Sequence, residues 1–200
     1  MPFSAPASST STLHPVLAGR WSPRGLDAHH QVGAADLETL LQAARWAPSA
    51  NNSQPWRFLV ATRGSGPFQQ LLDALAPGNQ LWAHAAGALV LAAAETVDAA
   101  GAPHRWAEYD TGQAVAALSL QAHALGLHVR QMGGFDAERV RGYFGLHDTL
   151  APLVVVAVGR HDPDASLPQA LAERETAPRS RQSLDALLLA SFPEAGARAA

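Results

Sequence analysis

The chain of 200 residues contains no cysteine and no lysine, so all fourteen of its basic residues are arginines. The absence of cysteine excludes disulfides, thiolate nucleophiles, iron–sulfur clusters and cysteine-based zinc sites. The absence of lysine excludes lysine Schiff-base chemistry and a Walker phosphate-binding loop. The chemistry of this protein therefore has to come from other groups.

A strong excess of one charge is also missing. Fourteen basic residues stand against seventeen acidic ones, for a net charge of -3. Proteins that bind nucleic acids usually carry a basic excess, so we expect no nucleic-acid partner. Hydrophobic residues make up 48% of the chain, which excludes a disordered protein and suffices for the core of one globular domain.

Long hydrophobic runs are absent as well. The longest, around residues 83–94, is too short to span a membrane and contains His84. The N-terminus has neither the basic start nor the apolar stretch of a secretory signal. We therefore expect a cytoplasmic protein without a membrane partner, with a flexible tail at residues 1–14 and a single domain at residues 15–190.

The elements expected from hydrophobic patterns mix helices with strands but do not alternate as regular βαβ units. This favours an α+β fold with a mixed central β-sheet flanked by helices. A helix is expected from Asp36, as its N-cap, to a stop at Pro48. Further helices are expected over 68–75, 104–125, 136–144 and 184–189, and strands over 57–62, 88–93, 128–131 and 152–158.

Three of these segments carry further expectations. The helix over 104–125 is apolar around most of its circumference and should be buried. The strand over 152–158 is continuously apolar and should lie in the centre of the sheet. Residues 159–190 are expected to form an extended C-terminal arm, because residues 159–182 are polar and hold three prolines.

Two arginine motifs have the spacing of a phosphate site. In an extended segment alternate side chains share a side, so Arg20, Ser22 and Arg24 would present two guanidinium groups and a hydroxyl together. Arg179 and Arg181 would do the same near the end of the chain. Such groups suit a phosphate monoester. Taken alone, the first motif is more typical of a solvated surface turn, and a solvated tail is the alternative for the second.

Two loops have the composition of a ligand site. Pro48–Trp56 reads Pro-Ser-Ala-Asn-Asn-Ser-Gln-Pro-Trp, and its amides could hydrogen-bond a planar heterocycle; an ordinary Asn-rich connection is the alternative. Gly133 and Gly134 follow a short strand and would let the backbone approach a ligand closely, or simply form a sharp turn. The nine histidines show no metal-binding spacing, so no metal site is expected.

The chain resembles the FMN-dependent nitroreductase family over about residues 15–190. The resemblance rests on the order and spacing of the two arginine motifs, the Pro48–Trp56 loop and the glycine pair. The Pro48–Trp56 string followed by a strand is the most specific match. The resemblance implies an FMN site shared by two subunits. At the phosphate, the resemblance implies Arg20, Ser22, Arg24, Arg179 and Arg181. At the flavin held mainly by the partner, it implies Ser49, Ala50, Asn52 and Gln54. Near the flavin ring, it implies Asn79, Gly133 and Gly134.

The helix over 104–125 is apolar on too many sides for a lone domain, and the polar arm is too long for an internal loop. We therefore expect a homodimer in which the helix packs at a two-fold interface and the arm wraps the partner. The resemblance implies a ping-pong reaction. NAD(P)H would be the donor, and a nitroaromatic, a quinone or a similar small electron-poor compound the acceptor. No catalytic side chain is expected, because the cofactor carries the chemistry and solvent can supply protons. Trp106 and Tyr109 are candidates for stacking on the substrate, with simple packing as the alternative.

One residue departs from the family pattern. Several branches carry a basic residue three positions after the asparagine, where this chain has Trp82; a backbone amide or Arg130 is a candidate replacement. Three alternatives for the function stay open. They are a flavin-dependent oxidase or dehydrogenase acting on another small molecule, a non-catalytic protein that stores or senses FMN, and a small interaction domain without a cofactor.

Overall fold

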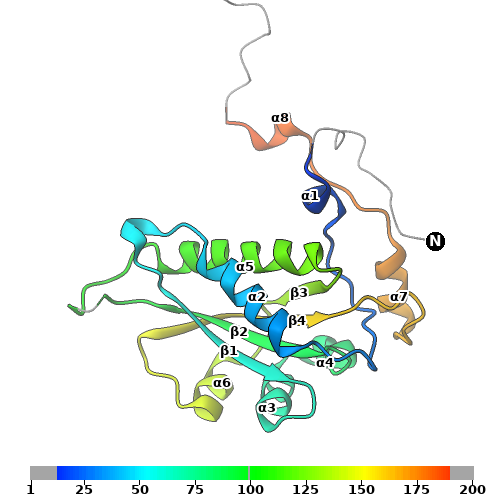
Figure 1. Cartoon of the computed structure of the whole chain (residues 1–200), viewed down its shortest axis with the longest axis horizontal. Helices are drawn as coiled ribbons and strands as arrows, with labels where there is room; N and C mark the ends of the chain where they lie inside the picture. The colour runs from blue at the N-terminus through cyan, green and yellow to red at the C-terminus, as the bar shows by residue number, and fades with distance from the viewer. Residues whose placement is uncertain (1–12, 99, 190–200) are drawn as a thin grey trace, which may run out of the picture.

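The computed structural model describes residues 13–98 and 100–189. Its centre is a four-stranded sheet in the order β1-β2-β4-β3. The strands are β1 (Trp56–Thr62), β2 (Ala88–Glu95), β3 (His128–Met132) and β4 (Leu150–Gly159). One face of the sheet is covered by α2 (Ala34–Arg45) and α5 (Ala107–Ala124), and the other by α3 (Gly66–Ala74), α4 (Pro77–Ala83) and α6 (Ala137–Phe144) (Figure 1).

The two faces of the sheet carry separate hydrophobic cores, because neighbouring strand residues point to opposite sides. Val90 and Val156 belong to the core under α2 and α5. Leu89 and Val155 belong to the core under α3, α4 and α6. The strand β4 lies between β2 and β3, and its end is buried on both faces, which confirms the prediction made from its apolar run.

The α+β class is confirmed, but the expectation of a mixed sheet is wrong for the part of the chain that the structure describes. All three strand pairs are antiparallel. The reason lies in the connections between neighbours. The segment with α3 and α4 leads from β1 to β2, and the segment with α6 leads from β3 to β4. Each connection starts and ends at the same end of the sheet, whereas parallel neighbours need a crossover along its length.

The helix limits differ from the sequence-based ones in several places. The helix α2 begins at Ala34 with Gly33 as its N-cap, so Asp36 lies in the first turn and is not the cap. The helices α1 (Pro15–Gly19), α4 and α7 (Gln169–Thr176) were not predicted, because proline and glycine in the first two indicated turns and the polar composition around the third indicated an extended arm. The arm expected to be extended therefore contains a helix, followed by α8 (Leu184–Leu187).

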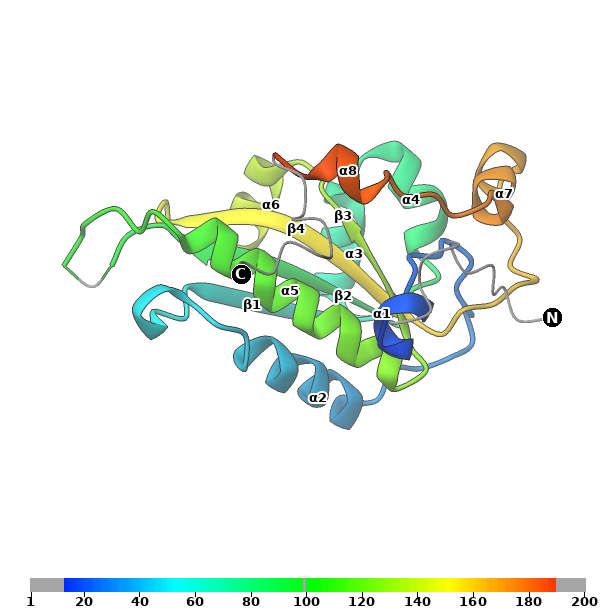
Figure 2. The ribbon, with the colours of Figure 1, turned by 90° about the horizontal axis from the view of Figure 1, so that it is seen from above.

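The helix α5 is buried on one side only within this chain, which corrects the expectation of burial all round. Ala114, Leu118 and Ala122 face the sheet and α2, whereas Tyr109 and Ala116 are exposed on the opposite side. Seen from above in Figure 2, α5 crosses the sheet diagonally and the short helix α1 lies beside its C-terminal half.

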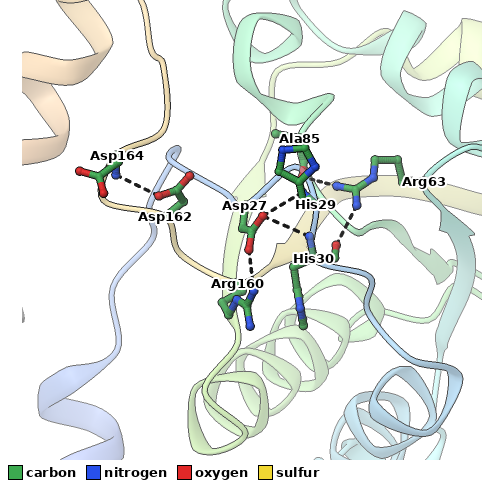
Figure 3. A network of polar contacts seen from close by, with 8 residues as sticks. All are labelled: Asp27, His29, His30, Arg63, Ala85, Arg160, Asp162 and Asp164. Atoms are coloured by element: carbon green, nitrogen blue, oxygen red, sulfur yellow. Dashed lines mark hydrogen bonds and ion pairs between the residues drawn. The ribbon is translucent and has the colours of Figure 1, made fainter.

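The N-terminal segment is fastened to the chain that follows β4, where Figure 3 shows the Arg160 side chain against that of Asp27. The Asp27 amide donates to the Arg160 carbonyl (2.9 Å), and the Asp162 amide donates to the Gly25 carbonyl (3.1 Å). The Arg160 guanidinium also lies 2.6 Å from the Asp27 carboxylate. The hydrogen bond from Arg160, followed by that from the His29 amide, lowers the pKa of Asp27 to about 2. Residues 25–27 are thereby held against the start of the C-terminal arm.

Of the predicted flexible tail at residues 1–14, residues 1–12 lie outside the described part. His14 belongs to the structure, where its Nδ1 accepts from the Val16 amide at the start of α1 (3.3 Å). Within the described residues, no helix is long and apolar enough to cross a bilayer.

Candidate functional site

Arginines from both ends of the chain meet in one place. The two terminal nitrogens of Arg179 donate to the carbonyls of Ala18 (3.1 Å) and Arg20 (3.0 Å). Arg20 in turn donates from Nη1 to Ser22 Oγ (3.2 Å). Burial, followed by the positive charges of Arg179 and Arg181, lowers the pKa of Arg20. The structure thus brings the two sequence-predicted arginine motifs into one neighbourhood, where their charges repel one another.

A cavity of about 330 Å³ lies beside these arginines. One wall is the N-terminal segment with Ser22 and Arg24, and the opposite wall is the end of α7 and the residues after it, up to Arg179. Hydroxyl and guanidinium groups line both walls, so the cavity has the donors that a phosphate or another oxyanion requires.

Arg24 plays a different part from Arg20. Its guanidinium lies 3.8 Å from the carboxylate of Glu175 on α7. Glu175 also accepts hydrogen bonds from the backbone amides of Arg24 (2.6 Å) and Gly25 (2.9 Å). A Cβ at Gly25 would stand 2.7 Å from the carbonyl oxygen of Asp162, so the tight approach of the two segments requires glycine. Arg24 therefore helps to dock the arm, besides lining the cavity.

Arg130 extends the basic lining from β3. It donates to the Ser22 carbonyl, and its Cζ lies 5.8 Å from the centre of the Trp82 ring. Trp82 is only 1% exposed and belongs to the core, so its ring cannot face a ligand. Burial, followed by the charge of Arg24, lowers the pKa of Arg130. Among the described residues Arg130 forms no close ion pair, although the negative charge of Glu175, which lines the same cavity, partly offsets this lowering.

The predicted glycine turn and the predicted asparagine also come together. Nδ2 of Asn79 on α4 donates to the carbonyl of Gly134 (3.2 Å), which also accepts from the Ala76 amide (2.9 Å). A Cβ at Gly134 would stand 3.3 Å from Cβ of Ala76, whereas a Cβ at Gly133 would meet open space. The backbone at Gly133 can therefore be approached closely. Asn79 and Trp82 both lie on α4, so the same helix contacts this turn and carries the ring that Arg130 approaches.

The loop at Ser49–Gln54 lies at the opposite end of the sheet from the arginines, in the cyan turn of Figure 1. Asn51, Asn52 and Gln54 adopt positive φ angles of 51°, 55° and 49°. The Gln54 amide donates to Ser49 Oγ (3.1 Å) inside the loop. The Ala50 amide donates to the carboxylate of Asp110 on α5 (2.9 Å). Within one chain the structure does not bring this loop to the arginine cluster.

The two candidate substrate residues lie beside this loop. Trp106 and Tyr109 are 48% and 65% exposed, and their rings meet edge to face with 6.3 Å between centres. Together with Ser49 and Ala50, they line a cavity of about 560 Å³. The guanidinium of Arg105 lies 4.8 Å above the Trp106 ring. An exposed aromatic pair beside a cavity has the form of a stacking surface.

A cluster of aromatic side chains adjoins the arginines. Trp21, His123, His128 and His161 make ring contacts with centres 4.9–6.0 Å apart. Burial, followed by His161 and His123, lowers the pKa of His128 to about 4. Within residues 13–98 and 100–189, no three His, Asp or Glu side chains are arranged to hold a metal ion.

Sequence reasoning missed Asp110 and Glu175. Each contacts a predicted site segment from more than fifty positions away along the chain. Asp110 resembled any acidic residue in the first turn of a helix, and Glu175 stood in a segment expected to be extended. No local signal in the sequence distinguished either residue.

These features define an α+β protein with an arginine-lined cavity of about 330 Å³ between the N-terminal segment and the C-terminal arm. The family model of the nitroreductase family matches residues 17–80 and 65–160. The chain therefore belongs to the nitroreductase family, which confirms the resemblance drawn from the sequence.

Two curated proteins are similar to the chain over most of their own length. An uncharacterized 15.4 kDa protein of Mycolicibacterium smegmatis is 38% identical over 140 residues, which cover 64% of this chain and 91% of that protein. The oxygen-insensitive NAD(P)H nitroreductase of Salmonella typhimurium is 25% identical, over 80% of this chain and 95% of that protein.

Two solved structures are similar throughout their length. A crystal structure of an oxidoreductase containing FMN has a TM-score of 0.86 and 33% identity, and it covers 96% of this chain and 99% of that one. A putative nitroreductase from Desulfovibrio desulfuricans, crystallised in complex with FMN, has a TM-score of 0.73 and 25% identity, and it covers 91% of this chain and 100% of that one.

Proposed function

We propose that this protein is an FMN-dependent oxidoreductase that uses NAD(P)H to reduce small electron-poor compounds such as nitroaromatics and quinones. The observation that carries the proposal is the convergence of Arg20 and Ser22 with Arg179 and Arg181 beside a cavity. The two solved relatives with FMN and the Salmonella NAD(P)H nitroreductase support the choice of cofactor and donor.

The residues present fit the cofactor. Several guanidinium groups that repel one another in the absence of an anion would gain charge-assisted bonds of roughly 1.5–3 kcal/mol each from a phosphate dianion. Gly133 leaves its backbone open to a flat ring, and Asn79 lies beside it. FMN ends in a phosphate monoester, whereas FAD does not, so the arginine cluster favours FMN.

The bound flavin would supply the transfer of electrons from the nicotinamide to the acceptor, each binding in turn. The arginines would hold its phosphate. Arg130, which forms no close ion pair among the described residues, would stand near the ring and favour its negatively charged reduced state. The aromatic pair Trp106 and Tyr109 would stack on the acceptor, and solvent would supply the protons.

We also propose that the site is completed by a second copy of this chain. The Ser49–Gln54 loop lies far from the arginines of its own chain, and α5 leaves Tyr109 and Ala116 exposed. Both features are explained if α5 packs at a two-fold interface, the arm wraps the partner, and the loop contacts the flavin held mainly by that partner. Sedimentation of holoprotein and apoprotein tests this. A holoprotein that stays monomeric at full FMN occupancy would refute the shared site.

Reduction by NAD(P)H is tested by absorbance under anaerobic conditions. The yellow protein should lose its flavin absorption when NADH or NADPH is added and regain it when a quinone or nitroaromatic follows. A protein that stores or senses FMN would keep its colour. An oxidase or dehydrogenase of another kind would bleach only with its own substrate. Because its proposed donor is a cytoplasmic reductant, we propose a cytoplasmic location.

A further inference from the structure

The carboxylate of Asp110 is buried in an unusual way. Its residue is 2% exposed, yet among the described residues it forms no ion pair. A carboxyl group that is largely removed from water is costly unless it is compensated, and Asp110 stands in the wall of the cavity that Trp106 and Tyr109 also line. Two sources of compensation are visible. Asp110 lies in the first turn of α5, where the helix dipole favours negative charge, and its Oδ2 accepts from the Ala50 amide (2.9 Å).

The loop that receives this bond is held in a strained conformation. Asn51, Asn52 and Gln54 are the non-glycine residues with positive φ in the described part of the chain. Non-glycine residues avoid this region, and they keep it only where the surroundings enforce it. Inside the loop, the amide of Asn52 donates to the Ser49 carbonyl (3.0 Å). The bond to Asp110 ties the start of this turn to the rigid helix α5.

We infer that Asp110 is a positioning residue that fixes the Ser49–Gln54 loop in the conformation in which it meets the flavin. The carboxylate holds one backbone amide at the first residue of the turn, and the turn then sets the direction of Ser49 and Asn52. The step from the loop to the flavin rests on the proposed function. The step from Asp110 to the loop does not, because it follows from the contacts of a single chain.

The first test uses hydrogen exchange of the apoprotein and needs no cofactor. In the native chain the Ala50 amide should exchange slowly although it lies in a surface loop; rapid exchange there would overturn the inference without any variant. Asp110→Leu fills the buried position but removes the acceptor, and should speed exchange of the Ala50 amide about tenfold or more. Asp110→Asn keeps an acceptor oxygen and should restore slow exchange.

The matched control is Ser119→Ala, which removes another buried polar group of α5. Ser119 is 3% exposed, and its hydroxyl donates to the Val115 carbonyl (2.7 Å), away from the loop. Its loss should leave exchange at residues 49–54 unchanged. Equal acceleration in Ser119→Ala and Asp110→Leu, or an effect of Asp110→Asn as large as that of Asp110→Leu, would overturn the positioning role.

The second test separates positioning from general stability. The loss of one hydrogen bond changes global stability only modestly, so the Asp110→Leu apoprotein should still unfold cooperatively, with a melting temperature within about 5 °C of the native one. The variant should nevertheless bind FMN and riboflavin more weakly by the same factor, about three- to thirtyfold, because the loop would contact the ring and not the phosphate. Unchanged flavin affinity with a released loop would contradict the link to the flavin. Absence of flavin binding in the native protein would refute the proposed function and leave the exchange result standing.

Discussion

The guanidinium of Arg179 donates a hydrogen bond to the backbone carbonyl of Arg20, with 3.0 Å between Nη2 and the oxygen. The two residues are 159 positions apart, and their side chains carry the same charge. The contact therefore joins the C-terminal arm to the N-terminal segment while leaving positive charge concentrated at one place. An anion bound there would relieve the repulsion, which explains why the two arginine motifs coexist.

The phosphate role of these arginines predicts a difference between two ligands. Arg20→Ala and Arg181→Ala should each reduce the affinity for FMN about ten- to a hundredfold more than the affinity for riboflavin, since only FMN carries the phosphate. Fluorescence titration of the apoprotein measures both affinities. Arg45→Ala, an exposed arginine of α2, is the control and should change neither. Equal weakening of the two flavins would mean that the arginines act through folding.

The docking of the arm on Glu175 predicts a change in protease sensitivity. Glu175→Ala removes the acceptor for two backbone amides and the partner of Arg24, so the arm should open more often. Trypsin should then cleave after the arginines at 174, 179 and 181 several times faster than in the native apoprotein. Glu173→Ala on the same helix removes an exposed carboxylate and is the control. Identical cleavage rates in the two variants would show that Glu175 does not fasten the arm.

The position of Arg130 predicts an effect on the potential of the bound flavin. Arg130→Met keeps a long apolar side chain over Trp82 but removes the positive charge. The reduced flavin would lose a stabilising cation, and its midpoint potential should fall by about 30 mV or more, which corresponds to about 1.4 kcal/mol. A redox titration against dyes of known potential measures this shift. An unchanged potential with normal FMN binding would place the charge of Arg130 elsewhere than near the ring.

The half-buried His128 predicts how stability depends on pH. The pKa of His128 falls from 6.5 to about 4 in the folded protein, so the unfolded chain binds the proton more readily. Stability is therefore complete above pH about 6.5 and is lost as the pH falls from there towards about 4. His128→Gln cannot take up the proton and should reduce this loss. Urea unfolding of both apoproteins across that range measures it, and equal pH dependence would contradict the assignment to His128.

Much of the fold could be predicted because the long elements carry a clear hydrophobic period or a continuous apolar run. The burial of Leu37 and Leu40 on α2 and the central place of β4 are examples. The antiparallel pairing could not be predicted, because it depends on which end of the sheet each connection leaves. The short helices α1, α4 and α7 were missed because proline and glycine in α1 and α4, and the polar surroundings of α7, are also typical of turns and extended segments.

The site was predictable only where several unusual residues stand together in the chain. The arginine motifs, the Pro48–Trp56 string and the glycine pair met that condition, and the structure brings the arginine motifs together and joins Gly134 to Asn79. The contacts of Asp110 with Ala50 and of Glu175 with Gly25 could not be predicted, because each is a single side chain that meets a distant backbone amide.

The identity of the cofactor released from the purified protein tests the central claim most directly. Protein purified from cells should be yellow, and chromatography of the denatured sample should yield FMN at about one molecule per chain. The arginines beside the cavity would bind a terminal phosphate monoester, which FMN carries and FAD lacks. Release of FAD, or of no flavin after incubation with excess FMN, would contradict it.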